Sequence, residues 1–215
     1  LLLPAVQAAR EAARRVAALN NMKQIMLGLL VYENDKKRFP AQANYDAAGK
    51  PLLSWRVHIL PYLEQEALYK QFRLDEPWDS DHNKQLIAQM PAIYAEPSSR
   101  LDPSEGKTHF LGVAGSGYFF TGTESPRKLK HFEDGISNSI AVVQVDDEHA
   151  VAWTKPQDWT PSEQDPLAGL GGVHAGDIAL SAFVDGSVRV ISLSIDVQAF
   201  KSLLTIAGGE ESPLP

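Results

Sequence analysis

Apolar side chains recur every three or four residues from Ala9 to Leu30, which is the spacing of one face of an α-helix. The stripe consists of Ala9, Ala12, Val16, Leu19, Met26 and Leu30. Pro4 suits the first helical turn, because the N–H that proline lacks has no partner there. The pattern predicts a helix over residues 4–33 that is strongly apolar only from Ile25 to Val31. We expect its second half to pack on a domain and its first half to project.

Short helices separated by loops are predicted for the middle of the chain. Ser54 can cap a helix that continues, with a break at a proline, to Phe72. Asp79 or Ser80 can cap a shorter helix that ends at Met90, just before another proline. We expect these short helices to lie around a sheet.

The hydrophobic period changes to two in the second half of the chain, which predicts β-strands. Residues 108–114 and 118–121 are expected to be strands around a glycine-rich turn. Residues 139–145 form a nearly continuous apolar run, typical of a central strand buried on both faces. Residues 177–192 predict a hairpin with a two-residue turn at Asp185-Gly186, in which both residues take positive φ. The predicted fold is α+β, with the long N-terminal helix packed on a mainly antiparallel sheet.

Composition and charge exclude several classes of function. The chain has 44% hydrophobic and 22% charged residues, as folded soluble proteins do. Its net charge of −7 argues against a nucleic-acid partner, because phosphate neutralisation needs a basic face. Cysteine is absent, which excludes a disulfide framework and a thiolate metal site. The glycines near Gly115 lack the Lys-Ser/Thr of a phosphate loop, and no cofactor is predicted.

Several motifs spread over nearly the whole chain resemble the DUF1559 proteins that are abundant in Planctomycetes. The first is the stretch Leu2–Arg15, followed by Asn20–Ile25. The others are Phe39-Pro40, Leu53–Arg56, Leu60–Gln65, Asp75–Ser80, Asp134–Ser139, Trp153–Pro156, and His174 followed by Asp185-Gly186. This family carries a prepilin-type N-terminal segment and a C-terminal motif in which nine residues separate a histidine from Asp-Gly.

The resemblance implies a pilin-like protein with a helix at residues 1–33 and a headpiece at residues 34–215. Leu1–Leu3 would end a membrane-embedded segment, so the protein would be anchored in the cell membrane with its headpiece periplasmic or extracellular. Partners would be other copies of the chain or components of a secretion or pilus system. The biochemical role of the family is unknown. Arg10, Arg14 and Arg15 oppose this topology, since basic residues beside a membrane helix usually mark the cytoplasmic side.

The chain departs from the family pattern in two respects. Family members often carry cysteine where this chain has Ala18 and Glu96, and the loss of both suits a family disulfide between helix and body. Ten residues rather than nine separate His174 from Asp185. One extra residue in a strand would reverse the faces of its side chains, so we expect a bulge near Gly176.

Two acidic clusters contain the residue types of a metal site: Asp79 with Asp81, and Asp146 with Asp147 and His149. The first cluster has the alternation of a calcium loop but lacks the Gly and Glu that such a loop needs, and helix capping explains it equally well. The second follows the predicted central strand and offers suitable ligand types. An acidic turn at the end of a strand is the commoner structure.

His174 and Asp185 have the residue types of a catalytic pair. Eleven steps of mostly extended chain would place them roughly 35 Å apart, which argues against direct contact. Residues 154–172 predict a long irregular loop, and loops of this length often bind a partner. The aromatic candidates for such binding are Trp55, Trp78, Trp153 and Trp159, of which Trp153 and Trp159 lie in or beside this loop.

Three hypotheses follow, in decreasing order of support. The first is a non-enzymatic structural subunit, similar to a pseudopilin, in which N-terminal helices pack laterally. The second is an anchored module that binds a glycan or another extracellular ligand, which clustered and exposed tryptophans would favour. The third is a metal-dependent hydrolase, which needs carboxylates and histidines in one cleft.

Overall fold

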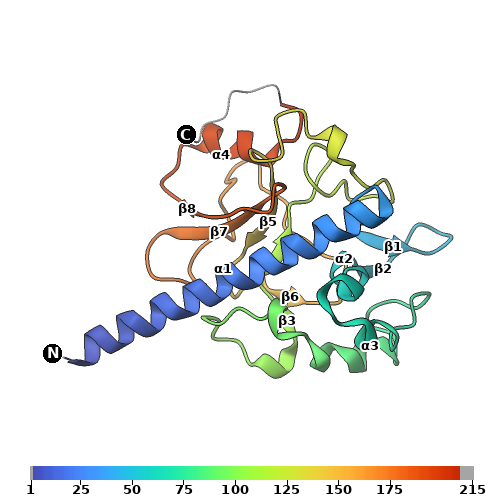
Figure 1. The fold of residues 1–215 in the computed structure, drawn as a ribbon, viewed down its shortest axis with the longest axis horizontal. Helices are drawn as coiled ribbons and strands as arrows, with labels where there is room; N and C mark the ends of the chain where they lie inside the picture. The colour runs from blue at the N-terminus through green and yellow to red at the C-terminus, as the bar shows by residue number, and fades with distance from the viewer. Residues whose placement is uncertain (1, 209–215) are drawn as a thin grey trace.

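A long N-terminal helix is the dominant element of the computed structural model, which describes residues 2–208 (Figure 1). This helix, α1, spans Leu2–Lys36 and so ends slightly beyond the predicted limit. Lys37 follows with a left-handed φ of 57°, a conformation that ends helices. Leu1, part of the predicted membrane-embedded end, lies outside the described residues. Among residues 2–208, no helix combines the length and the apolar character needed to cross a membrane.

A four-stranded antiparallel sheet, in the order β4-β5-β7-β8, forms the centre of the fold. Its strands are β4 (Phe110–Gly112), β5 (Ile140–Gln144), β7 (Ile178–Phe183) and β8 (Val188–Ser192). Every residue of β5 is buried, which confirms the predicted central strand. Two short antiparallel pairs accompany the sheet: β1 (Ala43–Tyr45) with β2 (Pro51–Ser54), and β3 (Lys107–Thr108) with β6 (Val151–Ala152). The fold is therefore α+β and pilin-like, as predicted.

The central sheet separates two hydrophobic layers. On one side, α1 buries Met22, Ile25 and Leu29 in a cluster with side chains of β5 and β7. On the other side, α4 (Val197–Leu204) buries Phe200 and its two leucines in a second cluster. Because each buried side chain of this kind contributes about 1.5–3 kcal/mol, both helices are firmly held to the sheet.

The N-terminal half of α1 projects from this body, as Figure 1 shows at its blue end. Residues 4–17 are exposed or at most half-buried, and full burial begins at Ala18. This confirms the expectation that the second half of the helix packs on the body. The division into a helix of residues 1–33 and a headpiece of residues 34–215 stays a prediction.

Short helical turns surround the sheet, and most are 3₁₀ helices. They are α2 (Trp55–His58), α3 (Glu66–Tyr69), η1 (Leu60–Leu63), η2 (Asn83–Gln89), η3 (Ala92–Tyr94), η4 (Pro103–Glu105) and η5 (Leu129–His131). Ser54 caps α2 as predicted, since its side chain accepts from the Arg56 N–H at 3.3 Å. Ser80 likewise accepts from the Asn83 N–H at 3.1 Å at the start of η2. The predicted helix at this place is therefore a 3₁₀ helix that begins later.

The β7–β8 hairpin forms where it was predicted, but with a different turn. The Gly186 N–H donates to the Phe183 carbonyl at 2.9 Å, and the Phe183 N–H donates to the Ser187 carbonyl at 2.9 Å. The loop therefore has three residues, and Gly186 alone among them has a positive φ, of 88°. The two-residue turn was a wrong prediction, because the longer loop matches the strand twist with a single left-handed residue.

Two further strand predictions were wrong. Residues 118–121 form only an isolated bridge between Phe120 and Ala114. Phe119 and Phe120 are both buried, and consecutive side chains of a regular strand point to opposite faces. Gly176, with φ of 92°, lies in a bend before β7 and not in a bulge. The additional residue after His174 is therefore accommodated outside the sheet.

Burial of His58 predicts how the stability of the fold depends on pH. The imidazole is mostly buried, with Nε2 at 3.0 Å from Asn44 Oδ1, and burial lowers its pKa from 6.5 to about 4. Between these two values the unfolded chain binds a proton that the folded chain does not. Lowering the pH from 6.5 to 4 should therefore reduce the free energy of unfolding by about 2–3 kcal/mol through this group.

Chemical denaturation over a series of pH values measures this dependence. In His58→Gln, the free energy of unfolding should fall by about 2–3 kcal/mol less between pH 6.5 and 4 than in the wild type. In His131→Gln, at a half-buried position, it should fall as much as in the wild type. An identical pH dependence in wild type and His58→Gln would contradict the prediction.

Candidate functional site

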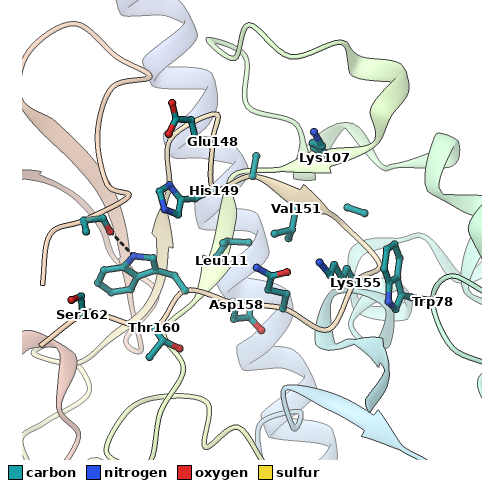
Figure 2. Close-up of a pocket in the computed structure, with 15 residues that line it drawn as sticks. Trp78, Lys107, Leu111, Glu148, His149, Val151, Lys155, Asp158, Thr160 and Ser162 are labelled. Atoms are coloured by element: carbon teal, nitrogen blue, oxygen red, sulfur yellow. Dashed lines mark hydrogen bonds between the residues drawn. The ribbon is translucent and has the colours of Figure 1, made fainter. Parts of the chain in front are cut away.

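A cleft of about 600 Å³ opens between the β3–β6 pair and the long loop that follows β6 (Figure 2). Lys107 lies on one side, Trp78 and Lys155 lie at one end, and Glu148 and His149 lie at the other. Leu111 and Val151 form its floor. This volume is within the range of about 300–1,000 Å³ that is usual for small-ligand sites.

A buried ion pair fixes the loop that forms one wall of the cleft. The Asp158 side chain is fully buried, and its Oδ1 lies 2.6 Å from Arg56 Nη2. The same oxygen accepts from Trp55 Nε1 at 3.0 Å and from the Gly112 N–H at 2.8 Å. Burial raises the pKa of the Asp158 carboxyl, and the Arg56 guanidinium opposes that shift. The loop is thus tied to α2 and to β4 by a single carboxylate.

The charged side chains of the cleft differ in whether they have a partner of opposite charge. Lys107 pairs with Glu105 at 2.7 Å, and His149 Nδ1 lies 2.7 Å from Asp146 Oδ1. The Lys155 ammonium lies 5.7 Å from the centroid of the Trp78 ring. No carboxylate of residues 2–208 forms a salt bridge with Lys155. The cleft therefore contains one cation whose charge the described residues leave unpaired.

Comparison with protein-family models identifies the chain. Residues 7–168, about three quarters of its length, match the family described as "Protein of unknown function (DUF1559)". The chain belongs to the DUF1559 family. This confirms the resemblance seen in the sequence motifs. Neither the curated proteins nor the solved structures gave a match.

The acidic clusters of this DUF1559 chain do not converge on one point. Asp146 pairs with His149 at the cleft, whereas Asp147 lies 2.7 Å from His109 Nε2 and accepts from Ser99. Burial acts to raise the pKa of Asp147, but hydrogen bonds from His109 and Ser99 outweigh it and hold the pKa below its usual value. Burial lowers the pKa of His109 despite the nearby carboxylate.

The other metal candidates lie elsewhere, in the turn that precedes η2. The Asp81 carboxylate is almost fully exposed and forms a salt bridge with Lys84. Asp79 is exposed in the same turn. Among residues 2–208, no three His, Asp or Glu side chains are placed to share a metal ion. A hydrolase that depends on such a cluster gains no support from the described part of the chain.

His174 of the family motif fastens α1 to the body and does not meet Asp185. Its Nδ1 lies 3.1 Å from Glu11 of α1, and its Nε2 lies 3.1 Å from the Gln144 amide. With the proton on Nδ1, the ring donates to Glu11 and accepts from Gln144. Glu96, whose pKa is raised by burial, lies 3.7 Å away. Asp185 and Gly186 lie beyond the other end of β7, so the structure separates the two parts of the motif.

Two of the four predicted binding aromatics, Trp78 and Trp159, line the cleft. Trp159 lines it and donates through Nε1 to the Ala168 carbonyl at 2.9 Å. Trp153 is fully buried and donates to the Ile87 carbonyl at 3.0 Å, so it presents no ring to a ligand. Trp55 is fully buried as well, whereas Trp78 is half-buried and lines the cleft. The sequence pattern did not distinguish Trp78 from the buried tryptophans, because its position depends on contacts remote in the chain.

Proposed function

We propose that this DUF1559 chain is a non-enzymatic, pseudopilin-like structural subunit. It would be exported and held to the membrane through its N-terminal helix, with the headpiece periplasmic or extracellular. Its partners would be copies of itself or components of a secretion or pilus system. The observation that carries the proposal is a second apolar stripe on α1, on the face turned away from the body.

This solvent-facing stripe has two parts, one from Val6 to Val16 at spacings of three and four residues and one at Leu27 and Val31, with a spacing of eleven residues from Val16 to Leu27. Its exposed members are Val6, Ala9, Ala13, Val16, Leu27 and Val31. The exposed fractions of Val16 and Leu27 are 55% and 58%, although side chains of this kind are normally covered. Helices with apolar residues at alternating spacings of three and four associate with other helices side by side. The stripe therefore supports lateral packing between α1 of neighbouring copies.

The distribution of charge favours a second copy as the occupant of this stripe. Before residue 33 the chain carries four basic residues and one acidic residue, Glu11. The whole chain has a net charge of −7, so the remainder is strongly acidic. A basic helix of one copy is electrostatically complementary to the acidic body of the next. Arg10, Arg14 and Arg15 would make these contacts in an assembly.

Cysteine cross-linking tests the lateral packing, and the absence of native cysteine makes single substitutions specific probes. Ala9→Cys places a thiol in the stripe, and Ala8→Cys places one at the neighbouring position outside it. Both alanines are exposed. In membranes of the source cells, the full-length Ala9→Cys protein should form cross-linked dimers, whereas Ala8→Cys should form few. Adding Val16→Glu to Ala9→Cys should remove the dimers, because it places a charge in the apolar contact.

Denaturing gel electrophoresis after treatment with a short bis-maleimide measures the result. Equal cross-linking at the two positions, or none at either, would contradict packing along the stripe. Thermal unfolding of the Val16→Glu protein provides the control. Val16 lies in the half of α1 that projects, so the headpiece should unfold at the wild-type temperature.

A further inference from the structure

We propose that the cleft between Trp78 and the loop after β6 binds an acidic saccharide, a sugar chain that carries carboxylates. This proposal does not depend on the assembly role of α1. It rests on the unpaired charge of Lys155, on the half-buried ring of Trp78, and on the neutral polar side chains of the loop.

The charge of the cleft selects an anionic group. Lys155 has no salt bridge within residues 2–208, whereas Lys107 across the cleft is paired with Glu105. A half-buried cation that forms no salt bridge in a chain of net charge −7 creates a local positive potential in an otherwise acidic protein. A ligand carboxylate can occupy this place and form a charge-assisted hydrogen bond with the ammonium.

The Trp78 ring adds an apolar surface beside that charge. The Lys155 ammonium lies 5.7 Å from the ring centroid, so one ligand unit can contact both groups. A sugar ring has an apolar face of C–H groups that can lie against an indole, and a uronic acid bears its carboxylate at the edge of the same ring. Tryptophan serves such mixed sites because it combines a large apolar surface with a polar edge.

The loop supplies hydrogen-bonding groups for hydroxyls. Gln157 and Thr160 are exposed and line the cleft. The backbone that carries them is fixed: the Trp159 N–H donates to the Gly112 carbonyl at 3.0 Å, and Asp158 is bound by Arg56. A site fixed before binding loses less conformational freedom when a ligand enters.

The remaining lining residues disfavour other ligands. Glu148 lies on the rim opposite Lys155, so a ligand must place its negative charge at Lys155 and uncharged groups at Glu148, which a densely charged polyphosphate cannot do. Leu111, Val151 and Trp159 are each less than one tenth exposed, so Trp78 is the principal aromatic surface of the cleft. A saccharide with a carboxylate at Lys155 and hydroxyls at Glu148 fits both ends of the cleft.

Isothermal titration calorimetry tests the proposal with three acidic tetrasaccharides: tetragalacturonate, tetramannuronate and a hyaluronan tetrasaccharide. For each acid that binds, its methyl ester is titrated as well, because the ester has the same sugar units without the negative charge. At least one acid should bind, and its ester should bind at least about tenfold more weakly, as expected for the loss of a hydrogen bond to a charged group. Lys155→Gln should weaken binding of the acid by a similar factor, while Lys50→Gln, at an exposed lysine of the β1–β2 turn, should leave it unchanged.

Each outcome supports or overturns the proposal. If none of the three acids gives a heat of binding at about 10 mM, the proposal is wrong, because a specific site has a dissociation constant below this concentration. If an acid and its ester bind with equal affinity, or if wild type and Lys155→Gln bind the acid with equal affinity, then the Lys155 charge does not recognise a carboxylate and the proposal is wrong. Thermal unfolding shows whether Lys155→Gln is folded. Because the assembly role is tested by cross-linking at Ala9, failure of either proposal leaves the other standing.

Discussion

Replacing Asp158 with alanine should lower the free energy of unfolding by about 3–5 kcal/mol, because it leaves the Arg56 guanidinium buried without its carboxylate. Both side chains are fully inaccessible to solvent and lie 2.6 Å apart. The substitution also removes the acceptor of the Trp55 indole N–H and the Gly112 N–H. Urea denaturation measures the loss. Asp177→Ala, at an exposed carboxylate in the segment before β7, should change stability little.

A double-mutant cycle distinguishes the loss of pairing from a general loss of packing. If the cost of Asp158→Ala comes mainly from the orphaned guanidinium, it should be smaller when Arg56 is already replaced by methionine. Equal costs in the two backgrounds would show that the pair contributes little. Asp158→Ala should also weaken binding in the cleft, since the loop that carries Lys155 loses one of its attachments to β4 and its ion pair with Arg56.

Replacing Trp153 with alanine should also cost about 3–5 kcal/mol, as expected for the removal of a large buried ring. The indole stacks on Tyr94 with centroids 5.6 Å apart and meets Phe72 edge to face at 5.6 Å. Its Nε1 donates to the Ile87 carbonyl, which fastens η2 to the core. Thermal and chemical denaturation measure the loss. Trp153→Phe should cost less, because it retains an aromatic ring and removes the N–H.

The same substitution separates the buried role of Trp153 from the binding role that the sequence suggested. A stable Trp153→Ala protein that had lost only saccharide binding would contradict burial and restore the ligand-contacting role. A protein with lowered stability and, where it is still folded, unchanged affinity agrees with the structure.

Elements with long, regular patterns were predicted well from the sequence. The helical period of α1, the apolar run of β5 and the alternation of β7 and β8 are local signals. The face of α1 was predicted less well: of the predicted stripe only Met26 is fully buried, because the body covers the face that carries Met22 and Ile25. Turn geometry was predicted less well. The hairpin residues Asp185-Gly186 fit both a two-residue and a three-residue loop, and the hydrogen bond from the Phe183 N–H to the Ser187 carbonyl shows that the chain forms the longer one.

The candidate site could not be predicted because its parts lie far apart in the sequence. Arg56 and Asp158 are separated by 102 residues, and nothing around either residue indicates the other. Glu11 pairs with Arg14 on the same helix, yet it also contacts His174, 163 residues away. Trp78 and Lys155 likewise meet only after folding. Composition identified suitable residue types, while their convergence is a property of the tertiary structure.

The way α1 is attached to the body determines how the protein carries mechanical load. The helix lies along the sheet from Ala18 onward, and the Glu11–His174 contact secures it nearer the free end. Tension along the helix axis would load these contacts in shear, so that many must break together. Tension across the axis would peel the helix from its free end, one contact at a time, beginning at Glu11. A headpiece held in this way resists axial pulling far better than lateral pulling, and the direction of the force would decide which contacts set the rate of unfolding.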